Sequence, residues 1–209
     1  MERTTSLSEA KEIFGPDFIG PEELSSLADD IGLSVPAEIP PLPFNPEHIR
    51  GKSRDYLLIL GISKWADGSP IDIISLRNRF GTDPKIAEPC FYNQDWYLAE
   101  SFANRELESK WFLVRKSVLA DSRAVAPEIL SEKYTFPSAV LSTFTFFVYW
   151  HLRAKILWPD DFIWCADFDY NGDRIYVGRY NDISEIGKKG FNIHRHLSIR
   201  SNYGCADST

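Results

Sequence analysis

The sequence predicts an α+β protein in which a mostly antiparallel sheet packs against a buried aromatic helix, preceded by an acidic helical amino-terminal arm. Of the 209 residues, 44% are hydrophobic and 14% aromatic, which is too much core-forming material for a disordered chain. Aromatic and aliphatic residues surround the helical wheel near residues 138–155, as in a helix buried on all sides. The carboxyl-terminal part instead contains short strand-forming runs separated by turn signals.

The first fifty residues carry the charge imbalance of the chain. They hold three basic and ten acidic side chains, which leaves twenty of each sign in residues 51–209, so the net charge of −7 arises in residues 1–50. We expect an acidic helical arm and a proline-rich strap over residues 1–50, followed by one α+β domain over residues 51–209. Helices are expected at residues 7–14 and 21–31, and five prolines over residues 35–46 predict an extended strap.

The middle of the chain predicts a strand, a helix and a second strand. Residues 55–63 are apolar at successive positions, as in a strand covered on both faces. Ser69 is a candidate N-cap for the helix that follows, and Gly81 lies where its C-cap belongs. Residues 91–103 are compatible with either a strand or a short helix, whereas residues 110–119 alternate as in a strand.

The carboxyl-terminal part predicts a β-hairpin. Strand-forming runs at residues 162–167 and 174–180 flank Asn171 and Gly172, a dipeptide typical of tight hairpin turns. A further run covers residues 191–200. Because threonine, valine and aromatic residues also favour strands, the segment near residues 138–155 has a β-rich alternative.

The predicted hairpin turn contains a candidate metal site. Oxygen-bearing side chains lie at alternate positions of a loop with glycine at its sixth position, as in the first half of a calcium-binding loop. The candidate metal ligands are Asp167, Asp169, Asn171 and Asp173. Position 12, which is a bidentate glutamate in an EF-hand, is Gly178, so only a looser calcium site is compatible. The alternative is that Asp and Asn form the turn by bonding their own backbone.

A second candidate site lies on the last predicted strand. If residues 191–200 form a strand, one face carries Asn192, His194, His196, Ser198 and Arg200. The opposite face carries Phe191, Ile193, Leu197 and Ile199, and Arg195 interrupts that apolar row. Two imidazoles on one face can bind a transition metal, with Asp167 or Asp173 completing the site. The alternative is a solvated polar face.

Basic side chains gather in the same part of the chain. They are Arg174, Arg179, Lys188, Lys189, Arg195 and Arg200, and three tyrosines, Tyr176, Tyr180 and Tyr203, lie near them in sequence. Guanidinium groups match phosphate and carboxylate groups, so this surface is a candidate for binding an anionic ligand. These side chains have two other interpretations: they bind the acidic arm, or they only increase solubility.

The leading hypothesis is a non-enzymatic binding or accessory protein that recognises an anionic ligand or a protein partner through its carboxyl-terminal β surface. The sequence lacks the nucleophile-elbow, phosphate-loop, dinucleotide-binding and zinc-protease motifs. The candidate ligand-binding residues are Arg174, Arg179, His194, Arg195, His196 and Arg200. The alternative is a metal-dependent hydrolase-like enzyme, with His194, His196 and Asp167 as ligands and Asp169 or Asp173 as the base.

Composition also bears on partners and location. Without an excess of basic residues, general nucleic-acid binding is not expected, and the apolar run near residues 139–150 is too short to span a membrane. Cys90, Cys165 and Cys205 lack paired spacing, which favours free thiols and a cytoplasmic location. No cofactor is indicated. The segments NGDRIYVGRY and GFNIHRHLSIR resemble the ending of an uncharacterised bacterial protein family of unknown function, a resemblance that implies a bacterial setting and no particular activity.

Overall fold

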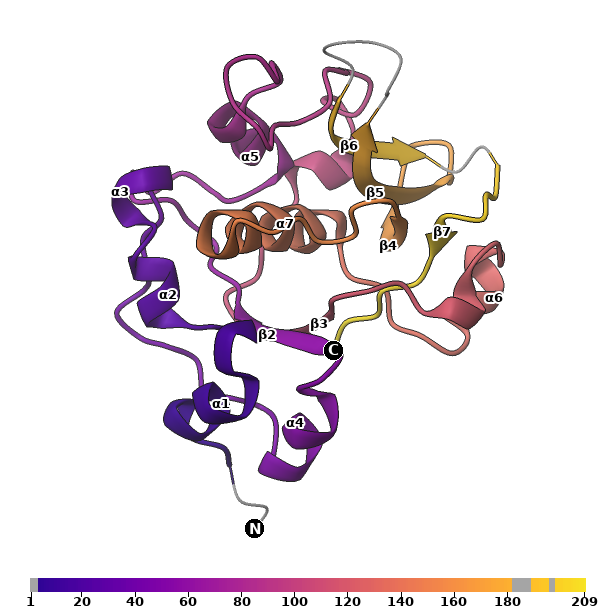
Figure 1. Ribbon diagram of the computed structural model, residues 1–209. Coiled ribbons are helices and arrows are strands. Elements are labelled where there is room, and N and C mark those ends of the chain that lie inside the picture. Colours follow the sequence, from indigo (N-terminus) through magenta and orange to yellow (C-terminus); the bar gives the residue numbers. More distant parts are fainter. Residues whose placement is uncertain (1–3, 182–188, 196–197) are drawn as a thin grey trace.

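A computed structural model describes residues 4–181, 189–195 and 198–209. Its α-helices are α1 (Leu7–Phe14), α2 (Pro21–Ser25), α3 (Ala28–Ile31), α4 (Pro46–Lys52), α5 (Ile73–Phe80), α6 (Pro127–Ser131) and α7 (Ala139–Arg153). Short 3-10 helices are η1 (Gly15–Asp17), η2 (Ser101–Asn104) and η3 (Ala120–Ser122). The strands are β1 (Phe18–Ile19), β2 (Tyr56–Leu60), β3 (Trp111–Arg115), β4 (Phe162–Phe168), β5 (Arg174–Asn181), β6 (Lys189–Arg195) and β7 (Tyr203–Gly204). These elements form an α+β fold with two mixed sheets, as the sequence predicts in class (Figure 1).

The smaller sheet has the strand order β1-β2-β3. Its central strand, β2, pairs in parallel with β1 and antiparallel with β3. All five residues of β2 are buried, which confirms the prediction of a strand covered on both faces.

The larger sheet has the strand order β6-β5-β4-β7. The first three strands are antiparallel, and β7 runs parallel to β4. The predicted hairpin joins β4 to β5, and Gly172 in its turn has a φ of 84°, a conformation that glycine adopts readily. Beyond β7 the chain continues to β3, where Leu113 and Thr209 exchange backbone hydrogen bonds of 2.8 and 3.1 Å, so the carboxyl-terminal segment links the two sheets.

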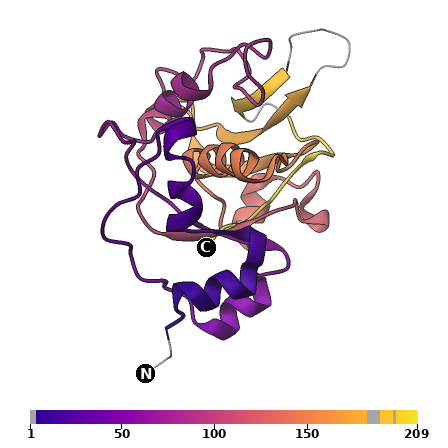
Figure 2. The same cartoon turned by 60° about the vertical axis from the view of Figure 1, so that its left-hand side comes forward.

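The aromatic helix α7 lies between the two sheets (Figures 1 and 2). Its first ten residues, 139–148, are all buried, which confirms the prediction of a helix surrounded by core. The side chain of Ser138 caps the helix by accepting a hydrogen bond of 3.2 Å from the backbone N–H of Leu141. In the described part of the chain, no helix combines the length and apolar character that a membrane crossing requires.

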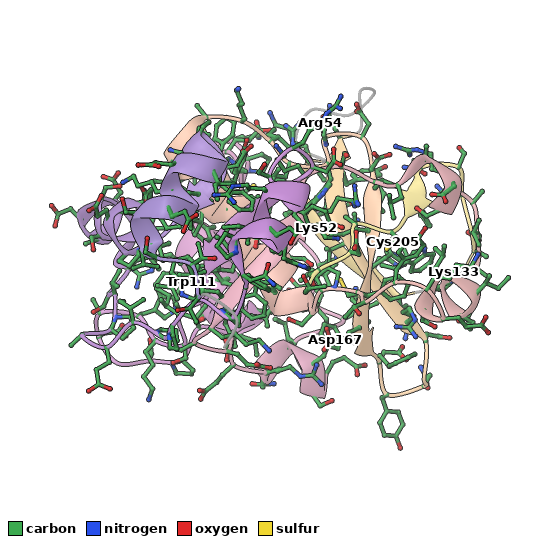
Figure 3. All side chains as sticks on the ribbon, turned by 90° about the horizontal axis from the view of Figure 1, so that it is seen from below. Lys52, Arg54, Trp111, Lys133, Asp167 and Cys205 are labelled. Atoms are coloured by element: carbon green, nitrogen blue, oxygen red, sulfur yellow. The ribbon has the colours of Figure 1, made fainter. Side chains whose placement is uncertain are left out.

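The amino-terminal segment shares the core of the rest of the molecule. Phe14, Phe18 and Leu24 are buried in the same hydrophobic cluster as β2 and α7. The predicted strap contains no helix or regular strand over residues 34–45 and crosses the smaller sheet, where the Pro40 carbonyl accepts a 2.8 Å hydrogen bond from the Trp111 side chain (Figure 3). The charge composition of the chain therefore changes near residue 50, whereas one hydrophobic core contains residues from both sides of that position.

Three local predictions are wrong in detail. Helix α5 is capped by Asp72 rather than Ser69, because residues 69–71 are held extended against residues 63–65 and the helix starts only after them. The expected helix over residues 21–31 is divided into α2 and α3. Residues 91–103 form neither a regular strand nor an α-helix; they make one bridge to β6 at Phe91 and then enter η2.

Candidate functional site

The two faces of the larger sheet have different surroundings. The apolar side chains of β5 and β6 that face α7 are Ile175, Val177, Phe191 and Ile193. On the other face, Tyr176 lies opposite His194 on the neighbouring strand. This alternation confirms that Asn192 and His194 share a face, opposite to Phe191 and Ile193.

A pocket opens on the face of the sheet that points away from α7. Its volume is about 520 Å³, which falls within the range of small-molecule sites. Strands β5 and β6 contribute to its lining together with residues 92–94, 159–162 and 200–203. Beside the pocket, Phe162, Trp164, Tyr176 and Tyr203 form a second buried cluster under α6.

Two tyrosine hydroxyls meet in the lining. The hydroxyl oxygens of Tyr176 and Tyr203 are 3.2 Å apart, so one donates a hydrogen bond to the other. Burial and this hydrogen bond raise the pKa of Tyr176, while the nearby charge of Arg200 acts in the opposite direction. Because the pair has two hydroxyl hydrogens and its mutual bond uses one, a second hydrogen remains to be donated to a ligand.

His194 lies flat against Tyr176, one member of this pair. Its ring stacks on Tyr176 with a centroid distance of 5.4 Å and an interplanar angle of 11°. The imidazole Nδ1 lies 2.9 Å from both the backbone N–H nitrogen and the carbonyl oxygen of Arg195, so the neighbouring peptide engages this nitrogen in either tautomer. The other ring nitrogen, Nε2, is therefore the one that can contact a ligand.

Arg200 is a pocket cation that no carboxylate of the described residues neutralises. Its side chain is exposed, and its carbonyl accepts a 3.0 Å hydrogen bond from the N–H of Tyr203, which closes a turn beside the tyrosine pair. Within the described residues, no carboxylate forms an ion pair with Arg200. The pocket thus brings a guanidinium, an imidazole and a phenol hydroxyl to one place.

The side-chain amides of Gln94 and Asn192 form another part of the lining, the amide rim. The side-chain nitrogen of Gln94 donates to Asn192 Oδ1 at 2.6 Å and to the carbonyl of Ile193 at 2.5 Å. Both hydrogens of the Gln94 amide are used, which fixes the orientation of the two amide groups. Among the described residues, nothing bonds the Gln94 Oε1 or the Asn192 side-chain nitrogen, which leaves one acceptor and one donor in the lining.

The other cationic side chains that the sequence suggests as ligand-binding residues are engaged by other groups of the protein. Arg179 borders the pocket, but its guanidinium forms an ion pair with Glu88, which also pairs with Lys189. Across the sheet Arg179 lies opposite Phe191, on the face toward α7. Burial raises the pKa of Glu88, but the two cations outweigh it and hold that pKa below its ordinary value, so the neutralising carboxylate stays ionised.

Arg195 and Arg174 also have other contacts. Arg195 reaches Asp169 at 3.3 Å and lies 5.3 Å from the centre of a Trp96 ring. Arg174 packs between the rings of Phe136 and Phe168 and donates a 3.1 Å hydrogen bond to the carbonyl of Cys165. The predicted residues His196 and Lys188 lie outside the described residues.

Asp167, the first candidate metal ligand, caps the central helix. It belongs to the face of β4 that points toward α7, and its side chain is only 1% exposed (Figure 3). Its Oδ2 accepts a 2.6 Å hydrogen bond from the backbone N–H of Ala139, the first residue of α7, and its Oδ1 is 2.6 Å from a guanidinium nitrogen of Arg105. Burial raises the pKa of Asp167, although both partners favour the carboxylate.

Asp169 holds the hairpin turn together. Its Oδ1 accepts backbone hydrogen bonds from Asn171 at 2.9 Å and Asp173 at 2.8 Å, and its Oδ2 faces Arg195. Burial opposes ionisation, but these donors lower the pKa of Asp169 below its ordinary value. The carboxylate thus forms the turn by bonding its own backbone, as the alternative interpretation of the sequence expects.

The structure separates the residues proposed to share one transition metal. Asp167 faces α7, whereas His194 faces the pocket on the other side of the sheet. Among the described residues, no three His, Cys, Asp or Glu side chains are arranged to hold a metal ion. The two candidate sites of the sequence are therefore distinct places; in the first, Asp167 and Asp169 are engaged by the protein itself, whereas the second is an open pocket.

Several lining residues have no signal in the sequence. Gln94 lies 98 positions from Asn192, and Tyr92, Pro159 and Asp160 come from irregular segments. Of the two amide residues, the sequence pointed only to Asn192, because alternation along the last strand placed it on the same face as His194. Comparison of the chain with protein-family profiles, with curated proteins and with solved structures finds no match.

Proposed function

We propose that this protein is a non-enzymatic binding protein whose carboxyl-terminal β surface recognises the anionic group of a small ligand. The observation that carries the proposal is the group formed by Arg200, His194 and the hydroxyl pair of Tyr176 and Tyr203 in one pocket. Hydrogen bonds from a charged donor to an anion are stronger than neutral ones, and a guanidinium fork matches phosphate or carboxylate oxygens.

A small ligand fits this place better than a protein surface does. The cavity has the volume of a small-molecule site, and its floor is formed by side chains that are almost fully buried, including Tyr176 and Tyr203. A metal-dependent hydrolase finds less support, because Asp167 and Asp169 are engaged with α7, the hairpin turn and two arginines.

Titration with inorganic phosphate tests the proposal. Calorimetry on the intact protein should detect binding, and Arg200→Ala should weaken it by about tenfold or more, because a hydrogen bond to a charged group contributes roughly 1.5–3 kcal/mol. The variant should unfold at the same denaturant concentration as the wild type, since Arg200 is exposed and forms no ion pair within the described residues.

Arg54→Ala is the matched control. Arg54 is also an exposed arginine, but it follows α4 and is not part of the pocket lining (Figure 3). Its removal changes the net charge by the same amount and should leave phosphate affinity within about twofold of the wild type. Equal losses in both variants would show a general charge effect, and absence of any phosphate binding would refute the proposal.

A further inference from the structure

The pocket is larger and more varied than a simple anion needs. Its donors for an anion gather around Tyr176, and the amides of Gln94 and Asn192 add a second set of polar groups to the lining. A single phosphate or carboxylate group would contact the first set alone. The second set therefore indicates what the rest of the ligand is made of.

The amide rim matches hydroxyl groups. Gln94 Oε1 accepts and the Asn192 nitrogen donates, and an alcohol both donates and accepts hydrogen bonds. Asp160, which also lines the pocket, adds a carboxylate that can accept from a hydroxyl but would repel an anion. Donors, acceptors and one acid around the same cavity suit a polyhydroxylated body rather than an apolar one.

Aromatic rings form part of the wall. Tyr92 and Tyr180 meet edge to face, with ring centroids 5.2 Å apart, and Phe162 lies in the floor. Such rings offer flat apolar area against which the carbon faces of a ring-shaped ligand pack. The wall thus complements a ring that carries hydroxyls on its edges.

The anion end favours phosphate over carboxylate. Arg200, the Nε2 of His194 and one tyrosine hydroxyl come from three different segments and so approach from different directions. A phosphate monoester presents three terminal oxygens to such donors, whereas a carboxylate presents two. We propose that the ligand is a sugar phosphate, with its phosphate at Arg200 and its hydroxyls at the amide rim; this inference rests on the proposed anion-binding function.

Calorimetry with four probes tests the inference: inorganic phosphate, ribose, ribose 5-phosphate and adenosine 5′-monophosphate. Ribose 5-phosphate should bind at least tenfold more tightly than phosphate, and ribose alone should bind more weakly than either. The nucleotide distinguishes the source of the sugar phosphate. Tighter binding of the nucleotide identifies a nucleotide ligand, and weaker binding identifies a free sugar phosphate.

Variants of the amide rim separate this inference from the proposed function. Asn192→Ala should reduce the affinity ratio of ribose 5-phosphate to phosphate to below about threefold. Because Asn192 is nearly buried, Asp160→Asn, at an exposed position, provides a second variant that should shift the same ratio, and thermal unfolding verifies that each variant is folded. If phosphate binds through Arg200 but the sugar adds nothing, only the sugar-phosphate inference fails. If none of the phosphorylated probes binds, both proposals fail.

Discussion

The turn between β4 and β5 and the pocket beside β5 and β6 contain similar polar groups but use them differently. At the end of β4 and in the turn that follows, Asp167 and Asp169 are almost fully buried, and their oxygens are engaged by backbone N–H groups and by two arginines. In the pocket, Arg200, His194 and the tyrosine pair retain hydrogen-bonding capacity that the described residues do not use. Polar groups that satisfy one another stabilise a fold, whereas convergent groups with capacity left over mark a binding site.

This difference predicts opposite consequences for substitution. Changes in the turn should reduce the free energy of unfolding, and changes in the pocket should reduce affinity without affecting stability. The arginines provide a further comparison, because Arg179 and Arg195 are neutralised by acids, whereas no acid of the described residues pairs with Arg200.

The largest effect is expected for Asp167→Ala. The substitution removes the acceptor for the Ala139 N–H at the buried start of α7 and the anionic partner of Arg105. Arg105 is 58% exposed, so most of the loss comes from the helix N-terminus rather than from the ion pair. The free energy of unfolding should fall by about 2–3 kcal/mol in urea denaturation.

Asp173→Ala is the control for this variant. Asp173 lies in the turn that follows β4 and contributes its backbone N–H and carbonyl to that turn, and these remain after substitution. Its stability should stay within about 0.5 kcal/mol of the wild type. Equal stability of Asp167→Ala and the wild type would contradict the role of Asp167 as the cap of α7.

A smaller effect that depends on pH is expected for Asp169→Asn. Burial opposes ionisation of Asp169, but the N–H groups of Asp173 and Asn171 and the Arg195 guanidinium lower its pKa below 3.8. A lowered pKa in the folded state means that the ionised form stabilises the fold above the unfolded pKa, and that this contribution is lost as the pH falls through the folded pKa. The variant should be less stable by about 1 kcal/mol near pH 7, and the difference should shrink as the pH falls through the lowered folded-state pKa of Asp169.

The pH dependence expected for Asp167, which lies in β4 two residues before Asp169, has the opposite sign. Burial raises the pKa of Asp167 above 3.8, so the wild type gains stability from this group as the pH falls through its folded pKa. Urea denaturation of Asp167→Asn and Asp169→Asn across the acid range should therefore show opposite slopes relative to the wild type. A stability difference for Asp169→Asn that does not change with pH would mean that its charge does not stabilise the turn.

Local patterns predict much of the fold but only part of the pocket. Alternation in β6 correctly places Asn192 and His194 on one face, and Asn171 with Gly172 correctly predicts the hairpin, because both signals arise from residues close in sequence. The bond from Ala139 to Asp167 spans 28 positions. A local sequence pattern cannot predict a contact over this distance. The sequence therefore suggests Asp167 as a metal ligand, whereas in the structure it accepts a hydrogen bond from the first residue of α7.

The pocket depends on contacts between residues that are even farther apart in the sequence. Gln94 reaches Asn192 and Ile193 from a segment whose secondary structure the sequence leaves open. Likewise, basic residues that are close in sequence are separated in space, because β6 ends at Arg195, which reaches Asp169, and does not extend to residue 200 as the sequence predicts. Arg200 lies beyond the strand and lines the pocket. Charge clustering in a sequence therefore predicts a basic region but not which of its members share a site.

The smallest effect is expected for Arg179→Ala. Arg179 borders the same pocket as Arg200, but Glu88 holds its guanidinium, and its position opposite Phe191 places it toward α7. A cation that is already neutralised adds little to the binding of a second anion, so phosphate affinity should stay within about twofold of the wild type. Calorimetry in the same buffer compares the phosphate affinities of Arg179→Ala and Arg200→Ala. Glu88→Gln removes the carboxylate that neutralises Arg179, and so shows whether this ion pair is the reason for the small effect. If Arg179→Ala loses as much affinity as Arg200→Ala, the guanidinium of Arg179 turns into the pocket when the ligand binds, and the ion pair with Glu88 is a competitor of the ligand.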